Sequence, residues 1–150
     1  MKQMIQSCTG FGHREVFQDI SGQLDDAVMQ IAGGGCKTFY TGAMGAFDSL
    51  FSSAVQKAKH SFPDIRLICV KPYMTNEINK HREYYYSLYD DIMIPAECAG
   101  VYYKSVITKR NCWMIDKSDI VLSYVFRHYG GAYQALLYAK AKQKQIITIG

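Results

Sequence analysis

Short apolar runs rich in β-branched residues alternate along this chain with segments in which apolar residues recur at helical spacing. This alternation is typical of a parallel sheet whose strands are connected by helices. Six strands are expected, at residues 4–9, 37–41, 65–70, 91–95, 120–125 and 146–149. The sequence therefore predicts an α/β fold, with a parallel sheet of about six strands and helices on both faces.

Helical spacing is clearest in two segments that follow the first and second expected strands. Leu24, Ala27, Val28 and Ile31 recur at i, i+3, i+4 and i+7. A second set has the same spacing and comprises Phe47, Leu50, Phe51, Ala54, Val55 and Ala58. Further helices are expected at about 103–116 and up to about residue 142, whereas 75–89 has only moderate helical patterning. With 150 residues and no linker, the chain is expected to form one domain, 1–150.

Composition bears on compartment and partners. The net charge of +4 is mild, and Lys140, Lys142 and Lys144 are interpreted as the solvated end of a helix, so nucleic acid is predicted to be an unlikely partner. The five cysteines contain no CxxC pair and are expected to be reduced and mostly buried. No segment resembles a signal peptide or a membrane span, so a cytoplasmic protein without a membrane partner is expected.

Metal and cofactor chemistry is not expected either. His60, His81 and His128 have no metal-ligand spacing with any cysteine or carboxylate, so no metal site is predicted. The chain contains neither a GxxxxGK[ST] motif nor a GxGxxG motif, which argues against a P-loop and an ordinary dinucleotide site. No cofactor is predicted.

Glycine marks three junctions between a predicted strand and the following helix. These are Gly10 with Gly12, Gly42 with Gly45, and Gly130 with Gly131. Junctions of this kind line the crevice at the carboxyl ends of parallel strands, where ligands bind. Glycine lets the backbone turn and approach a ligand, and the N–H groups of the next helix can then hold a phosphate.

The order of motifs resembles the SLOG superfamily, named for its SMF/DprA and LOG members, and is most similar to its YpsA-like branch. The matching elements are Thr9-Gly10-Phe11-Gly12-His13-Arg14, Gly42-Ala43-Met44-Gly45-Ala46-Phe47-Asp48, Arg110-Asn111-Cys112-Trp113-Met114 with Ser118-Asp119, and Gly130-Gly131 with Tyr138-Ala139. This resemblance covers essentially the full length. It implies a Rossmann-like fold that binds a nucleotide or an ADP-ribose-like molecule.

Carried onto this sequence, the resemblance implies a ligand-binding set made of Gly10, Gly12, His13, Arg14, Gly42, Gly45, Asp48, Arg110, Asn111, Gly130 and Gly131. Arg110 is expected to hold phosphate or ribose oxygens in its planar fork. Asp48 either caps its helix or binds ribose. His13 and Arg14 form either an acid/base and phosphate pair or part of a solvated loop.

The sequence departs from the LOG enzymes after the last glycine pair. Those enzymes carry a catalytic glutamate there, where this chain has Ala132-Tyr133-Gln134-Ala135-Leu136-Leu137. We therefore assign no catalytic residue and expect a sensor or sequestering module, with a homo-oligomer as a further expectation. Two alternatives remain at this point: an N-glycosidase that uses Asp116 or Glu15, and an interaction protein with a vestigial pocket.

Overall fold

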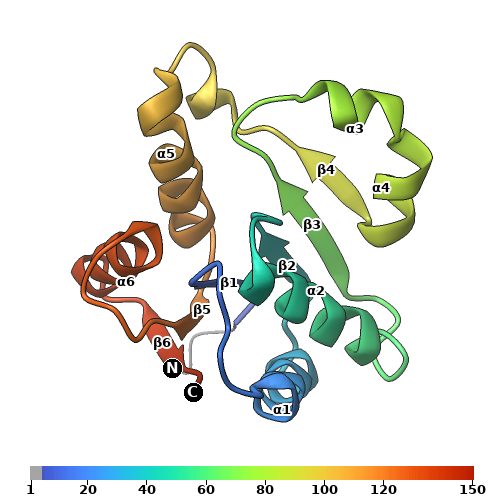
Figure 1. Ribbon diagram of the computed structural model, residues 1–150. Coiled ribbons are helices and arrows are strands. Elements are labelled where there is room, and N and C mark those ends of the chain that lie inside the picture. The colour runs from blue at the N-terminus through green and yellow to red at the C-terminus, as the bar shows by residue number, and fades with distance from the viewer. Residues whose placement is uncertain (1–4) are drawn as a thin grey trace.

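A computed structural model of the chain describes residues 5–150 and shows one six-stranded sheet (Figure 1). The strands are β1 (Ser7–Gly12), β2 (Thr38–Thr41), β3 (Arg66–Val70), β4 (Asp91–Met93), β5 (Ile120–Tyr124) and β6 (Gln145–Thr148). Their order across the sheet is β4-β3-β2-β1-β5-β6, and all five pairings are parallel. The predicted all-parallel α/β sheet is confirmed.

Helices cover both faces of the sheet, as expected. The helices are α1 (Ser21–Gly33), α2 (Ala46–Ala58), α3 (Asn76–Lys80), α4 (Arg82–Leu88), α5 (Tyr103–Asp116) and α6 (Gly131–Ala141), with a short 3₁₀ turn η1 (Ala96–Cys98). On one face α1 and α2 bury Leu24 and Phe51 against strand residues such as Phe39. On the other face α5 and α6 close over Phe11 and Val121.

The chain continues as a strand through Gly12, so Gly10 and Gly12 do not form the turn predicted for 10–13. The first predicted strand, 4–9, also begins at a position outside the described residues. A Cβ at Gly12 would lie 2.5 Å from Cγ of Phe47, and one at Gly10 would lie 2.8 Å from Cδ2 of Phe51. Both glycines are therefore needed because the phenylalanines of α2 lie directly on β1.

The segment 75–89 forms two short helices rather than one element. Thr75 begins α3 by accepting the N–H of Ile78 on its hydroxyl oxygen at 3.3 Å, whereas α4 buries none of its side chains. Tyr84 and Tyr86 are 61% and 51% exposed, so neither side chain is buried against the sheet. The helical pattern is weak here because these helices cover little of the core.

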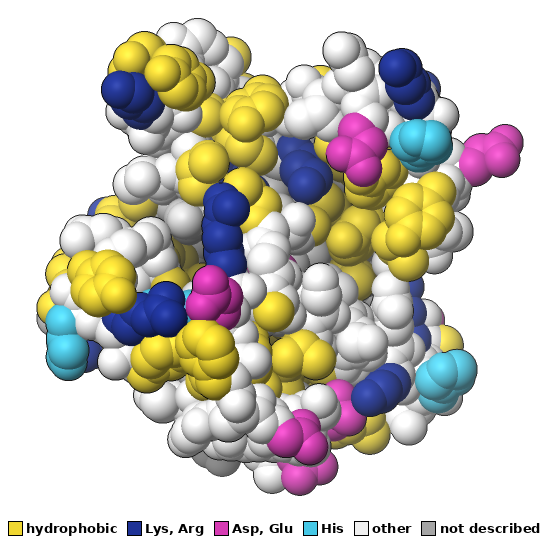
Figure 2. Space-filling view, in the orientation of Figure 1, with side chains coloured by type: hydrophobic (Ala, Val, Ile, Leu, Met, Phe, Trp, Pro, Cys, Tyr) yellow, Lys and Arg dark blue, Asp and Glu magenta, His cyan; other side chains and the backbone are white. Residues whose placement is uncertain are grey.

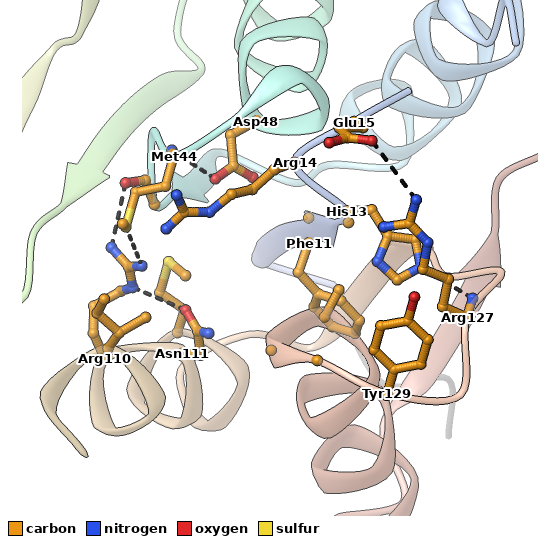
Figure 3. Close-up of a pocket in the computed structure, with 18 residues that line it drawn as sticks. Phe11, His13, Arg14, Glu15, Met44, Asp48, Arg110, Asn111, Arg127 and Tyr129 are labelled. Atoms are coloured by element: carbon orange, nitrogen blue, oxygen red, sulfur yellow. Dashed lines mark hydrogen bonds and ion pairs between the residues drawn. The ribbon is translucent and has the colours of Figure 1, made fainter. Parts of the chain in front are cut away.

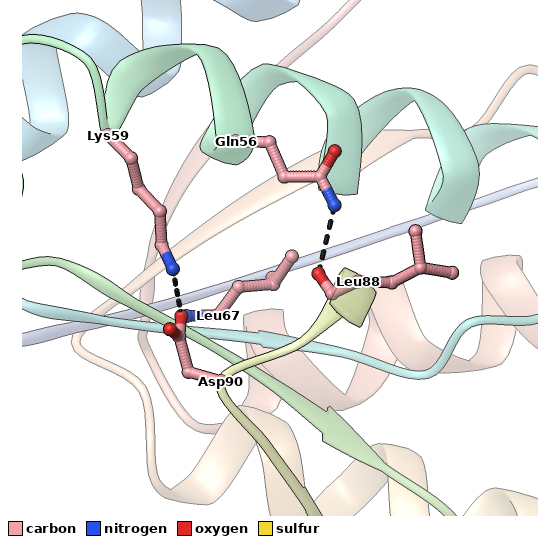
Figure 4. A network of polar contacts seen from close by, with 5 residues as sticks. All are labelled: Gln56, Lys59, Leu67, Leu88 and Asp90. Atoms are coloured by element: carbon pink, nitrogen blue, oxygen red, sulfur yellow. Dashed lines mark hydrogen bonds and ion pairs between the residues drawn. The ribbon is translucent and has the colours of Figure 1, made fainter. Parts of the chain in front are cut away.

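A polar network fastens the end of α4 to α2 (Figure 4). Asp90 accepts from the Lys59 ammonium and from the Leu67 N–H at 2.7 Å. The Gln56 side chain donates to the carbonyl oxygen of Leu88 at 2.9 Å. These contacts hold the edge strand β4 in place, although α3 and α4 bury few residues themselves.

The cysteines are free, as expected; four are buried and Cys112 is partly buried. Burial raises the pKa of Cys36 and of Cys69 to about 11, so both are neutral thiols at physiological pH. Within residues 5–150, no helix combines the length and apolar character that crossing a membrane requires.

Candidate functional site

One pocket of about 390 Å³ lies at the carboxyl ends of the central strands (Figure 3). It is lined by Gly10, Phe11, Gly12, His13, Arg14, Glu15, Gly42, Met44, Asp48, Ile107, Arg110, Asn111, Met114, Arg127, Tyr129, Gly130, Gly131 and Ala132. Of the residues expected from the sequence, only Gly45 is missing from this lining. The structure thus brings together four segments that are far apart in the sequence, and their contact with a ligand remains a prediction.

The position of the pocket follows from the strand order. β1 pairs with β2 on one side and with β5 on the other, so the loops that leave β1 and β5 diverge. A crevice opens where neighbouring strands connect in opposite directions, and ligands of doubly wound sheets bind there.

The Arg110 side chain is buried in the lining of this pocket and does not extend into its space. It is 2% exposed, and its Nη1 donates to the carbonyl oxygens of Val70 at 2.9 Å and Gly42 at 3.2 Å. Its Nε donates to Oδ1 of Asn111 at 2.9 Å. Burial lowers the pKa of Arg110, an effect that Asp48 opposes. Both Nη1 hydrogens are used within the protein, so a bidentate grip on a ligand would require rearrangement.

Asp48 closes the turn before α2. One carboxylate oxygen accepts the N–H of Met44 at 2.8 Å, so the capping alternative is the contact present in the structure. Burial raises the pKa of Asp48 to about 6, against the lowering effects of the Met44 N–H and of Arg110, Lys71 and Arg14. The pocket wall therefore carries a carboxyl group that titrates close to physiological pH.

His13 is neither in a solvated loop nor free to act as an acid/base. It is 7% exposed, and its Nε2 accepts the backbone N–H groups of Phe126 at 3.0 Å and Arg127 at 3.1 Å. Burial first, and the charge of Arg127 second, lower the pKa of His13. The imidazole thus ties the end of β1 to the loop between β5 and α6.

The start of α6 presents unpaired N–H groups to the pocket. Its N-cap, Gly130, has φ 93° and ψ 178°, a conformation open essentially to glycine alone, and no side chain caps the helix. Among residues 5–150, nothing accepts the N–H groups of Gly131 or Ala132, both of which line the pocket. At the start of α2, by contrast, the Arg14 carbonyl accepts the N–H of Ala46 at 2.9 Å.

Gly45 is also an N-cap with positive φ, 104°, and a Cβ there would lie 2.8 Å from Cα of Arg14. Glycine is therefore required at position 45 both by the backbone conformation and by the close contact with the chain after β1. A side chain at this position would strain the fold itself, so its substitution cannot report on ligand binding alone.

The sequence interpretation missed Arg127, Tyr129, Ile107 and Met114 as pocket residues, and it named Glu15 only as an alternative catalyst. Nη2 of Arg127 lies 3.7 Å from Oε2 of Glu15, and the guanidinium lies 4.9 Å from the centre of the Phe126 ring. Arg127 and Tyr129 could have been found by their position just before Gly130. Ile107 and Met114 lie one helical turn from the Arg110–Asn111 pair on α5.

The other acidic residues of interest lie elsewhere. Both carboxylate oxygens of Asp116 accept from the Tyr138 hydroxyl, at 2.8 and 2.9 Å, and Asp116 does not line the pocket. Asp119 accepts the N–H groups of Gln6 and Ser7, so it has a structural role. Within the part of the chain that the structure describes, no group of three or more His, Cys, Asp or Glu residues could hold a metal ion.

The face shown in Figure 2 is hollowed between α5 and the α3–α4 pair. Lys and Arg side chains lie along this hollow, and apolar side chains border it on both sides (Figure 2). Exposed aromatic residues of these bordering elements include Tyr102 and Tyr103 at the start of α5 and Tyr84 and Tyr86 on α4.

Comparison by sequence finds no matching family model, and no curated protein matches significantly. Comparison by structure finds DNA processing protein A from Helicobacter pylori, with a TM-score of 0.69 and 16% identity over 97% of this chain. It also finds DprA from Streptococcus pneumoniae, with a TM-score of 0.72 and 10% identity over 96% of this chain. This chain covers 65% and 50% of those two chains, respectively.

A third solved structure, the structural-genomics target TM1055, matches with a TM-score of 0.58 and 15% identity, over 95% of this chain and 72% of its own. The Helicobacter protein binds single-stranded DNA. The expectation that nucleic acid is an unlikely partner was therefore wrong. That expectation rested on a mild net charge. Net charge alone does not exclude nucleic-acid binding by a fold that a single-stranded DNA-binding protein shares.

Proposed function

We propose that this chain, which has the fold of the SLOG superfamily, binds a nucleotide or a nucleotide-derived phosphate ligand in the pocket beside β1 and β5 without turning it over. Placement in the YpsA-like branch is part of the proposal and rests on the motifs alone. The observation that carries it is the uncapped start of α6, whose free N–H groups line the pocket.

The ligand phosphate is expected at the N–H groups of Gly131 and Ala132. The positive end of a helix dipole favours an anion there, and two N–H groups without an acceptor can donate to it. Arg127 lies on the same loop and can add a charge-assisted hydrogen bond once it leaves Glu15. The pocket volume of about 390 Å³ falls in the usual range for small-molecule sites.

The absence of turnover is argued from the carboxylates that line the pocket. Among its lining residues these are Glu15, which is exposed and faces Arg127, and Asp48, which is buried and holds the Met44 N–H. Glycosidic cleavage requires a carboxyl group free to act at the bond that breaks. If the N-glycosidase alternative holds, Glu15 is its candidate, because Asp116 lies outside the pocket.

Single-stranded nucleic acid is the second candidate ligand. It is favoured by the fold shared with the Helicobacter protein and by exposed aromatic rings near Arg127. Phe126 is 47% and Tyr129 is 68% exposed, and bases stack on such rings at a stabilisation of about 1–3 kcal/mol each. A phosphate of the strand would then occupy the position proposed for the nucleotide phosphate.

Titration calorimetry with ADP-ribose, AMP and a 5′-phosphorylated oligothymidylate tests the proposal. Gly131→Val is the critical variant, because an added Cβ meets no protein atom within 4 Å and would enter only the proposed phosphate space. Gly22→Val in α1 is the matched control, since its added Cβ is equally unhindered and Gly22 does not line the pocket. We expect Gly131→Val alone to lose binding.

Each result has a distinct meaning. Tighter binding of AMP or ADP-ribose identifies a receptor for a small nucleotide ligand, and tighter binding of the oligonucleotide identifies a single-strand binder. Equal affinity of Gly131→Val and Gly22→Val for every probe would refute the proposed site. Release of free base or ribose phosphate at ~1 per second or faster would refute the absence of turnover. The expected homo-oligomer stays a prediction, tested by light scattering.

A further inference from the structure

The loop between β5 and α6 is held by one side chain from another strand. His13 follows β1, and its Nε2 accepts the N–H groups of Phe126 and Arg127 at 3.0 and 3.1 Å. The backbone N–H of His13 donates to the carbonyl oxygen of Tyr124 at 3.3 Å. Gly130, where α6 begins, lies only three residues beyond Arg127. The imidazole therefore fixes the segment that leads directly to the unpaired N–H groups of α6.

Two N–H donors on one imidazole nitrogen determine the state of the ring. A nitrogen that accepts must carry no proton, so the ring is neutral and its single proton resides on Nδ1. Protonation would place an N–H at Nε2, pointing at two backbone N–H groups. Three donors would then face one another without an acceptor, and the two backbone N–H groups would have to move away.

The charges around His13 do not favour its protonated form. Arg127 from the β5–α6 loop and Arg14 from its own segment are cationic, and Glu15 is paired with Arg127. The rings of Tyr124 on β5 and of Phe126 pack against the imidazole in edge-to-face geometry, with ring centres 6.3 and 4.4 Å from its own. Within residues 5–150, no carboxylate accepts a hydrogen bond from the ring. Burial and Arg127 keep the pKa of His13 below its ordinary value, in agreement with this geometry.

We propose that His13 is a proton-sensitive positioning residue: the neutral ring holds the β5–α6 loop in its ligand-binding position, and protonation releases it. The consequence for ligand affinity rests on the proposed function, whereas the release of the loop does not. Binding then weakens as the pH falls below about 6.5, the ordinary pKa of histidine, because the released ring takes up a proton there whereas the held ring resists it.

Two substitutions distinguish the loss of the hydrogen-bond acceptor at position 13 from the protonation of the side chain there. In His13→Gln, the side-chain amide oxygen can occupy the place of Nε2 and accept the same N–H groups, but it does not titrate. In His13→Phe, the ring volume is kept and the acceptor is lost. The glutamine variant is expected to keep the loop closed from about pH 7.5 to about pH 5.5, and the phenylalanine variant to leave it open at both.

Hydrogen exchange of the ligand-free protein tests whether His13 holds the β5–α6 loop. In the wild type, protection of the Phe126 and Arg127 amides should fall on the order of tenfold between about pH 7.5 and 5.5, after correction for intrinsic rates. Protection of Ile149, whose N–H donates to the Ser123 carbonyl at 2.8 Å, serves as the reference and should not change. Protection of the two loop amides that is equal in wild type, His13→Gln and His13→Phe would overturn the proposal.

The affinity for ADP-ribose supplies the second readout. Its pyrophosphate has no proton to take up near neutral pH, unlike a phosphate monoester with a second pKa of about 6. Wild-type affinity should fall by more than about twofold over the same interval, because the ligand binds only the closed fraction, while that of His13→Gln stays within about twofold. The same acid loss in both proteins overturns the proposal. If ADP-ribose does not bind at all, the proposed ligand fails and exchange alone decides on His13.

Discussion

Arg110 on α5 donates from Nη1 to the carbonyl oxygen of Val70 at 2.9 Å, and so connects the helix to the last residue of β3. The same nitrogen reaches the Gly42 carbonyl after β2 at 3.2 Å. One buried guanidinium therefore holds the ends of two neighbouring strands under a helix. A Cβ at Gly42 would lie 3.0 Å from the guanidinium carbon, so this glycine leaves room for Arg110.

Arg110→Ala is expected to destabilise the protein by about 3 kcal/mol, because two buried carbonyl groups lose a charged donor. Arg110→Lys should recover only part of this, since an ammonium on a flexible chain cannot reproduce the planar fork. Urea unfolding measures both. Lys109→Ala, an exposed neighbour on the same helix, is the control and should change stability by less than about 0.5 kcal/mol. Equal stability of Arg110→Ala and Lys109→Ala would contradict this prediction.

Gly12→Ala should lower the free energy of unfolding by about 1–3 kcal/mol, because the added methyl group would meet Phe47 at 2.5 Å. The midpoint of urea unfolding should shift without a change in slope. The double variant Gly12→Ala with Phe47→Leu should be less destabilised than the sum of the single changes, since the smaller side chain relieves the overlap. Simple additivity would show that the two residues do not compete for space.

Gly130→Ala should cost about 1–3 kcal/mol although its added Cβ has no neighbour, since φ 93° is strained for any residue with a side chain. Gly131→Ala, one position later and also without neighbours, should be neutral or slightly stabilising. Thermal unfolding of the two variants distinguishes backbone strain from crowding. If they melt at the same temperature, the conformation of Gly130 is not the constraint we infer.

Asp48→Asn should stabilise the protein at neutral pH. Burial raises the Asp48 pKa from 3.8 to about 6, so this group favours folding fully below pH 3.8 and loses that contribution as the pH rises through about 6. Asparagine can still accept the Met44 N–H and does not titrate. The variant should match the wild type near pH 4 and exceed it by about 1–3 kcal/mol above pH 7. A constant difference across the titration would refute the raised pKa.

Much of the fold was predictable because the inner strands β1, β3 and β5 are largely buried and stand out as apolar runs. The helix over 103–116 was predicted close to its observed limits. β1 was ended too early because glycine is usually interpreted as a turn. The reason for Gly10 and Gly12 lies in Phe47 and Phe51 of α2, and no local pattern reveals which side chains cover a strand.

The site was partly predictable for a related reason. Glycine junctions at strand ends identify the edge of the sheet, and the motifs added Arg110 and Asn111 on α5. The orientation of the Arg110 side chain could not be predicted, because its partners Val70 and Gly42 belong to other strands. Arg127 and Glu15 were missed as a pair for the same reason. The number of basic residues, without their positions, did not indicate whether the chain binds nucleic acid.

The central place of β1 in the sheet has a consequence for synthesis of the chain. β1 is the first strand to be translated, yet one of its two neighbours, β5, begins only at Ile120. At about 5–20 residues per second, the strands β1 to β4 are available seconds before the second edge of β1 is covered. During that interval Phe11 and the open side of β1 are exposed to solvent or to a chaperone. A ribosome stalled before Ile120 should therefore display an aggregation-prone half-sheet.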